Sequence, residues 1–130
     1  MKNPEELLNT YNQISSETIF LKKEIEFLLK ILRNCYSSSS NLEKIKLLDS
    51  YWKGFEKNIA ELELVLQNTN QNENSLAYSY QNGMIEYNTY DFTNNPLIKK
   101  YKDIEKEVKL LKESFYEYMH GCNACSFKTT

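Results

Sequence analysis

Residues that interrupt regular structure are scarce in this chain. Its 130 residues include three glycines and two prolines. Proteins built from many short strands need Gly and Pro at their turns, so a β-sandwich or another loop-rich fold is disfavoured. A chain of this length usually forms one domain, and we expect 1–130 to be a single helical-bundle domain.

Long apolar runs and a strong excess of one charge are also missing. No apolar stretch approaches the roughly 20 residues that a membrane-spanning helix needs, and the first residues contain no apolar signal segment. The formal net charge is −2, which gives no overall attraction to nucleic acid or to an anionic membrane. We therefore expect a small acidic cytoplasmic protein that binds neither nucleic acid nor membrane.

Residues that carry chemistry are few. The chain has one histidine and three cysteines, and it contains no recognisable catalytic or nucleotide-binding motif. Thiols in a chain of this composition are more often reduced or metal-bound than paired in disulfides. We expect a protein that is not an enzyme and has no cofactor, unless its cysteines hold a structural zinc ion.

Apolar residues at alternating steps of three and four dominate the first part of the chain. This spacing is typical of amphipathic helices that pack on partner helices. We expect a helix at 4–35, because Asn3 can cap it and Pro4 suits its first position. Its apolar seam comprises Leu7, Tyr11, Ile14, Thr18, Leu21, Ile25, Leu28, Leu32 and Cys35, of which Thr18 has the most polar side chain.

Two later segments repeat the same spacing and predict helices at 41–67 and 96–120. The short serine-rich connection at 36–40 returns the second helix alongside the first. The sequence therefore predicts an antiparallel, coiled-coil-like bundle of three helices running up, down and up. The second seam comprises Ile45, Leu48, Trp52, Phe55, Ile59, Leu62 and Leu66, and the third Leu97, Tyr101, Ile104, Val108, Leu111, Phe115 and Tyr118.

Polar residues at 67–75 follow the second seam, and the period then changes. Apolar and polar residues alternate on both sides of Asn82-Gly83, which is typical of a β-hairpin with a tight turn. The sequence predicts such a hairpin at about 76–90, in which Tyr78 faces Tyr87.

The tyrosines of this segment are candidate partner-binding residues. Aromatic side chains are favoured in the cores of protein interfaces, and a strand edge can pair with a partner strand. Alternatively, the tyrosines pack on the helices and stabilise the hairpin. The residues concerned are Tyr78, Tyr80, Tyr87 and Tyr90.

Phe20 and Phe27 widen the apolar arc of the first helix beyond its seam. They either contact neighbouring elements of the same chain, such as the hairpin, or face a second chain. A homodimer is therefore a candidate assembly.

Four lysines form an outer stripe on the third helix. Such a stripe can meet an acidic partner or phosphates, although a run of this kind more often faces solvent. The lysines are Lys99, Lys102, Lys106 and Lys109.

One histidine and three cysteines are candidates for a metal site. In an up-down-up bundle Cys35 ends the first seam at the pole where His120 and Cys122 end the third, and Cys125 can fold back toward them. Three cysteines and one histidine form a recognised structural zinc set. A disulfide, reduced buried thiols and a reactive cysteine enzyme are the alternatives.

The sequence predicts a non-enzymatic protein–protein interaction module, of the class of small inhibitors, immunity proteins and adaptors. It would bind a protein partner through its hairpin and helix faces. A zinc-stapled helical module is the alternative.

Overall fold

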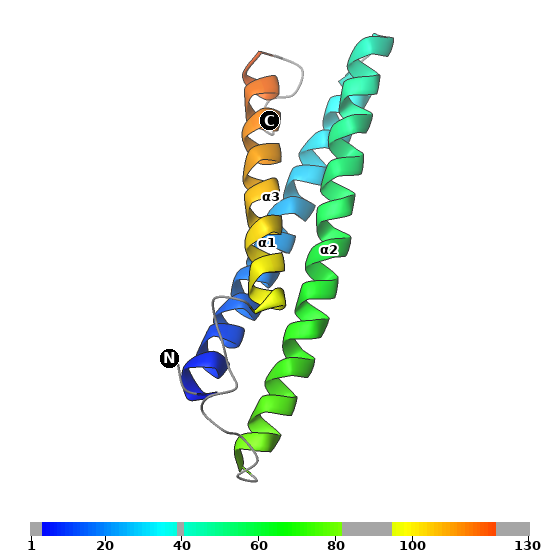
Figure 1. The fold of residues 1–130 in the computed structure, drawn as a ribbon. Helices are drawn as coiled ribbons and strands as arrows, with labels where there is room; N and C mark the ends of the chain where they lie inside the picture. The colour runs from blue at the N-terminus through cyan, green and yellow to red at the C-terminus, as the bar shows by residue number, and fades with distance from the viewer. Residues whose placement is uncertain (1–3, 39–40, 82–94, 122–130) are drawn as a thin grey trace.

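Three helices make up nearly all of the described chain. The computed structural model describes residues 4–38, 41–81 and 95–121. The helices are α1 (Pro4–Ser38), α2 (Leu42–Gln81) and α3 (Pro96–His120). Figure 1 shows α1 and α3 running in one direction and α2 in the opposite direction. The predicted helical bundle is therefore confirmed.

Side-chain caps start α2 and α3. The Asn41 Oδ1 accepts a hydrogen bond from the Glu43 amide at 2.8 Å. The Asn95 Oδ1 accepts two, from the amides of Leu97 at 3.0 Å and Ile98 at 3.1 Å, and Pro96 occupies the first helical position. These bonds satisfy amide groups that have no partner within the helix.

The predicted β-hairpin at 76–90 is wrong. Helix α2 continues through the polar stretch at 67–75 and ends at Gln81, and none of the described residues forms a strand. Asn and Gln weaken a helix less than Gly does and far less than Pro does, and Thr69 and Leu76 are buried here. Packing of these two side chains therefore keeps the segment helical, although its polar composition predicted a break. The Asn82-Gly83 pair lies outside the described residues.

The buried stripe of α2 is also rotated from the predicted seam. Leu48, Phe55 and Leu62 are fully buried as expected. From Trp52 onward, at every second position of the seam, the buried residue is one place earlier in the sequence than predicted. The reason is that α2 packs against both α1 and α3, so its buried stripe points between these two helices. Tyr51, Asn58 and Val65 are buried, whereas Trp52, Ile59 and Leu66 are partly exposed.

Helix α2 packs closely against both α1 and α3, while the backbones of α1 and α3 lie farther apart. Gly54 allows one of these close approaches. A Cβ atom at this position would lie 2.8 Å from Cδ2 of Leu111 on α3. The absence of a side chain at Gly54 therefore brings α2 and α3 together.

Replacing Gly54 with Leu is expected to lower the free energy of unfolding by about 1–3 kcal/mol, because the new side chain displaces Leu111 or α3. Ala60→Leu, on an exposed position of the same helix, is the matched control and should have little effect. Adding Leu111→Ala should recover part of the loss. Urea unfolding of the wild type and the three variants measures this, and equal stability of Gly54→Leu and Ala60→Leu would refute the close contact.

Tyr36 links the end of α1 to the start of α2. Its hydroxyl donates a hydrogen bond to the Asp49 carboxylate, and its ring lies edge-on to Trp52. Burial, followed by the hydrogen bond and the charge of Asp49, raises the pKa of Tyr36 from 10.0 to about 12.

The folded state therefore holds the Tyr36 proton more tightly than the unfolded state does. The resulting stabilisation is complete below the unfolded pKa and is lost as the pH rises through the folded pKa. We expect the free energy of unfolding to fall between pH 10 and about 12, and to fall less in Tyr36→Phe. Urea titrations across this range test it, and parallel pH curves for the two proteins would contradict it.

Candidate functional site

Phe20 and Phe27 are the large aromatic residues that α1 leaves in solvent. Their side chains are 66% and 57% exposed. They lie seven residues apart, and therefore on one side of the helix. Glu17 and Glu24 precede them by three residues each, and both glutamates contact α3. The two phenylalanines thus form a row, called here the phenylalanine row, beside the α3-facing side of α1.

A groove runs between α1 and α3. Its first part has a volume of about 770 Å³ and is lined by Thr10, Ile14 and Glu17 of α1. A second part of about 720 Å³ continues past Leu21 and ends at Lys112. The parts are continuous along α3, since both are lined by Lys102, Asp103 and Glu105.

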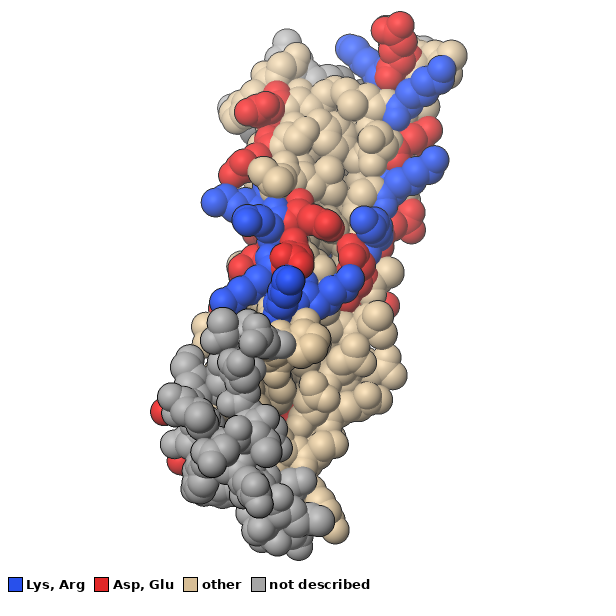
Figure 2. Space-filling view, in the orientation of Figure 1, with Lys and Arg blue, Asp and Glu red and all other residues tan. Residues whose placement is uncertain are grey.

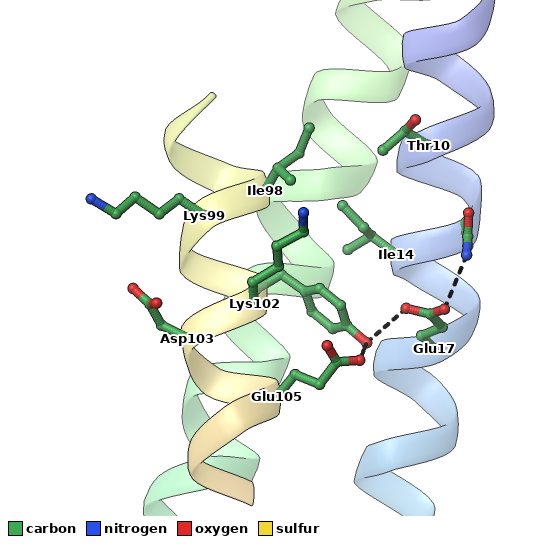
Figure 3. Close-up of a pocket in the computed structure, with 10 residues that line it drawn as sticks. Thr10, Ile14, Glu17, Ile98, Lys99, Lys102, Asp103 and Glu105 are labelled. Atoms are coloured by element: carbon green, nitrogen blue, oxygen red, sulfur yellow. Dashed lines mark hydrogen bonds between the residues drawn. The ribbon is translucent and has the colours of Figure 1, made fainter. Parts of the chain in front are cut away.

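Side chains connect α1 and α3 across the groove, where the two backbones are not in close contact. The Tyr101 hydroxyl is 2.9 Å from Oε2 of Glu17 and 3.2 Å from Oε2 of Glu105. Dashed lines that end on Glu17 and Glu105 mark these hydrogen bonds in Figure 3. Burial, followed by the hydrogen bond to Glu17, raises the pKa of Tyr101 above its ordinary value. The hydroxyl donates to these carboxylates and thereby ties α3 to α1. Lys112 makes a second tie by pairing with Glu24.

The four lysines of the predicted stripe lie along this groove. Lys99 and Lys102 line its first part, and Lys102, Lys106 and Lys109 line its second part. All four are exposed. Within the described residues, none of them has a carboxylate at ion-pair distance, whereas Lys22, Lys100 and Lys112 do. Their charges are available to a ligand.

Of the four tyrosines proposed as partner-binding residues, the structure describes the side chain of Tyr78 alone. Tyr78 lies on α2 and is 63% exposed. Tyr80 also belongs to α2, and its side chain lies outside the described part, as do Tyr87 and Tyr90. Between 64 and 81 the only charged residue of α2 is Glu73. Figure 2 accordingly shows an almost uncharged surface toward the lower end of α2 and mixed charges above it.

The candidate metal ligands are only partly described. Cys35 is fully buried and His120 is exposed at the C-terminal end of α3. The ends of α1 and α3 lie at the same pole in Figure 1. Cys122 and Cys125 lie outside the described residues. Within 4–38, 41–81 and 95–121, no group of three His, Cys, Asp or Glu side chains could hold a metal ion.

The sequence did not reveal which side chains bridge α1 and α3. Glu17, Glu24 and Tyr101 are ordinary amphipathic-helix residues, and their bridging role depends on how far apart α1 and α3 lie. One signal was present in the sequence. A second 4-3 row on α1 runs beside the core seam and comprises Gln13, Glu17, Phe20, Glu24, Phe27 and Ile31.

Comparisons with known proteins do not assign a family. Neither a protein-family model, nor a curated protein sequence, nor a solved structure matches this chain. Among the described helices, none combines the length and apolar composition that crossing a membrane requires. The geometry of the groove and the phenylalanine row is therefore the basis for a functional proposal.

Proposed function

We propose that this protein is a non-enzymatic interaction module that binds another protein through the phenylalanine row of α1. The exposure of Phe20 and Phe27 is the observation that carries the proposal. Burying a phenylalanine side chain contributes about 1.5–3 kcal/mol relative to leaving it in water. Aromatic residues are also enriched in the cores of protein interfaces.

The spacing of the row suits a helical or extended partner segment. Seven helical residues correspond to a rise of about 10 Å, so one partner element can contact both rings. The two side chains also adjoin the α1–α3 groove, where Ile14 and Leu21 add apolar lining. The surface combines apolar anchors with a polar border, as interfaces of this kind do.

Affinity capture from extracts of the source cells tests the proposal. Wild-type protein and Leu110→Ser should retain the same partner, and Phe20→Ser/Phe27→Ser should lose it. Leu110 is a matched control because it is 63% exposed and does not line the groove. Retention of the partner by the double variant would contradict the proposal.

A second copy of the chain is one protein that the phenylalanine row could bind. Sedimentation equilibrium of the same three proteins decides this. A homodimer that dissociates only in Phe20→Ser/Phe27→Ser would identify the partner as the chain itself. A wild-type monomer would leave a different protein as the partner.

A further inference from the structure

We infer that the partner presents an acidic amphipathic helix, which lies along the α1–α3 groove with its apolar face on the phenylalanine row and its carboxylates on the lysines. This inference rests on the proposed function and adds the chemistry of the partner. The occupant is one element of a different protein.

The shape of the groove favours a helix. The groove lies between two helices that run in the same direction (Figure 1) and whose backbones are more widely spaced than those of the other neighbouring pairs. Its lining extends on α3 from Ile98 to Lys112, a rise of about 21 Å. An amphipathic helix laid in an apolar groove is a recurrent mode of recognition, and about four turns fit this length.

Apolar residues form part of the groove lining, among polar and charged side chains. Ile14, Leu21 and Val108 contribute to its lining. Phe20 follows Glu17, which lines the groove, by three residues, and Phe27 follows Glu24, which pairs with Lys112 at the end of the groove, by three residues. A partner helix therefore needs apolar residues at helical spacing on the face that enters the groove.

Lysines border this apolar surface on both sides. On α3, the positions of Lys102, Lys106 and Lys109 differ by four and three, so their side chains follow one side of the helix. On α1, Lys23 and Lys30 follow Phe20 and Phe27 by three residues each and are exposed. Carboxylates on both flanks of a bound helix would meet these lysines.

The carboxylates already in the groove disfavour a nucleic acid. Glu17, Asp103 and Glu105 line it, and they would repel a continuous phosphate backbone. A helix can place its acidic residues selectively beside the lysines. The lysines also disfavour a second copy of the chain, because a symmetric groove-to-groove contact would oppose two lysine rows.

A displayed library of helical peptides tests the inference. Each peptide carries apolar residues at i, i+3, i+4 and i+7, and every flanking position encodes Glu or Lys with equal frequency. The baits are wild type, Phe20→Ser/Phe27→Ser and Lys102→Glu/Lys106→Glu/Lys109→Glu. Lys44→Glu/Lys53→Glu/Lys57→Glu on α2 is the control with the same change in net charge. Circular dichroism first verifies that each bait is folded.

Selection on wild type and on the α2 control should enrich Glu over Lys at the flanking positions by about tenfold, the sum of several modest ion pairs. The α3 charge reversal should instead enrich Lys on the flank that faces α3, while the flank that faces Lys23 and Lys30 keeps its preference for Glu. A milder bait, Lys102→Ala/Lys106→Ala/Lys109→Ala, should show little preference on the flank that faces α3.

The two proposals fail in different ways. Binding that depends on Phe20 and Phe27 but shows no charge preference would overturn the inference and leave the proposed function standing. Selected peptides that bind equally without the phenylalanines would count against both. A labelled single-stranded oligonucleotide serves as the phosphate probe, and tight binding that needs the α3 lysines but not the phenylalanines would also overturn the inference.

Discussion

Replacing Leu28 with Ala is expected to lower the free energy of unfolding by about 2–5 kcal/mol. The Leu28 side chain is fully buried in the core. Removing its methyl groups loses burial and leaves a cavity that the surrounding helices only partly fill. Urea unfolding followed by far-ultraviolet circular dichroism measures the change, and Trp52 fluorescence provides a second probe. A loss below about 0.5 kcal/mol, the range of ordinary surface substitutions, would show that the core is misplaced.

Replacing Phe27, the residue before Leu28, should weaken partner binding and leave the stability of the bundle nearly unchanged. Because its side chain is 57% exposed, Phe27→Ala should change the free energy of unfolding by no more than about 0.5 kcal/mol. Its affinity for the captured partner should fall by about tenfold or more, as expected for an aromatic anchor at an interface. Isothermal titration calorimetry gives the affinity, and Leu110→Ala is the control. Destabilisation of the bundle without loss of affinity would show that Phe27 is a structural residue.

The first helix could be predicted well from the sequence. Eight of the nine seam residues of α1 are buried and Leu21 is partly buried. The reason is that α1 has one closely packed neighbour, α2, so its buried residues follow a single apolar stripe that can be read from the sequence. Pro4 stands at the first position of α1 as predicted, and Asn95 with Pro96 stands at the start of α3.

The second helix could not be predicted as well, because two neighbours share its surface. Tyr51 and Asn58 are buried in place of Trp52 and Ile59, and sequence spacing alone does not reveal a stripe that faces between two helices. The alternation from Leu76 to Tyr80 is too short to distinguish a strand from a helix. Burial of Leu76 in the core, together with the absence of Gly and Pro from residues 55–82, favours the helix.

The candidate binding surface could be predicted only in part. Phe20 and Phe27 were identified because they fall outside the core seam. The groove was not, because it depends on the wider spacing of α1 and α3 and on side chains that bridge it, such as Tyr101 and Glu17. Lysine spacing alone likewise did not show that the stripe on α3 lies along the α1–α3 groove.

Site-specific photo-crosslinking in the source cells tests the central claim most directly, namely that the phenylalanine row binds another protein. A photoreactive phenylalanine analogue replaces Phe20, Phe27 or Leu110, one at a time, and the adducts are identified by mass spectrometry. The account predicts the same protein adduct from positions 20 and 27 and none from position 110. No protein adduct at 20 and 27, or equal adducts at all three positions, would contradict it.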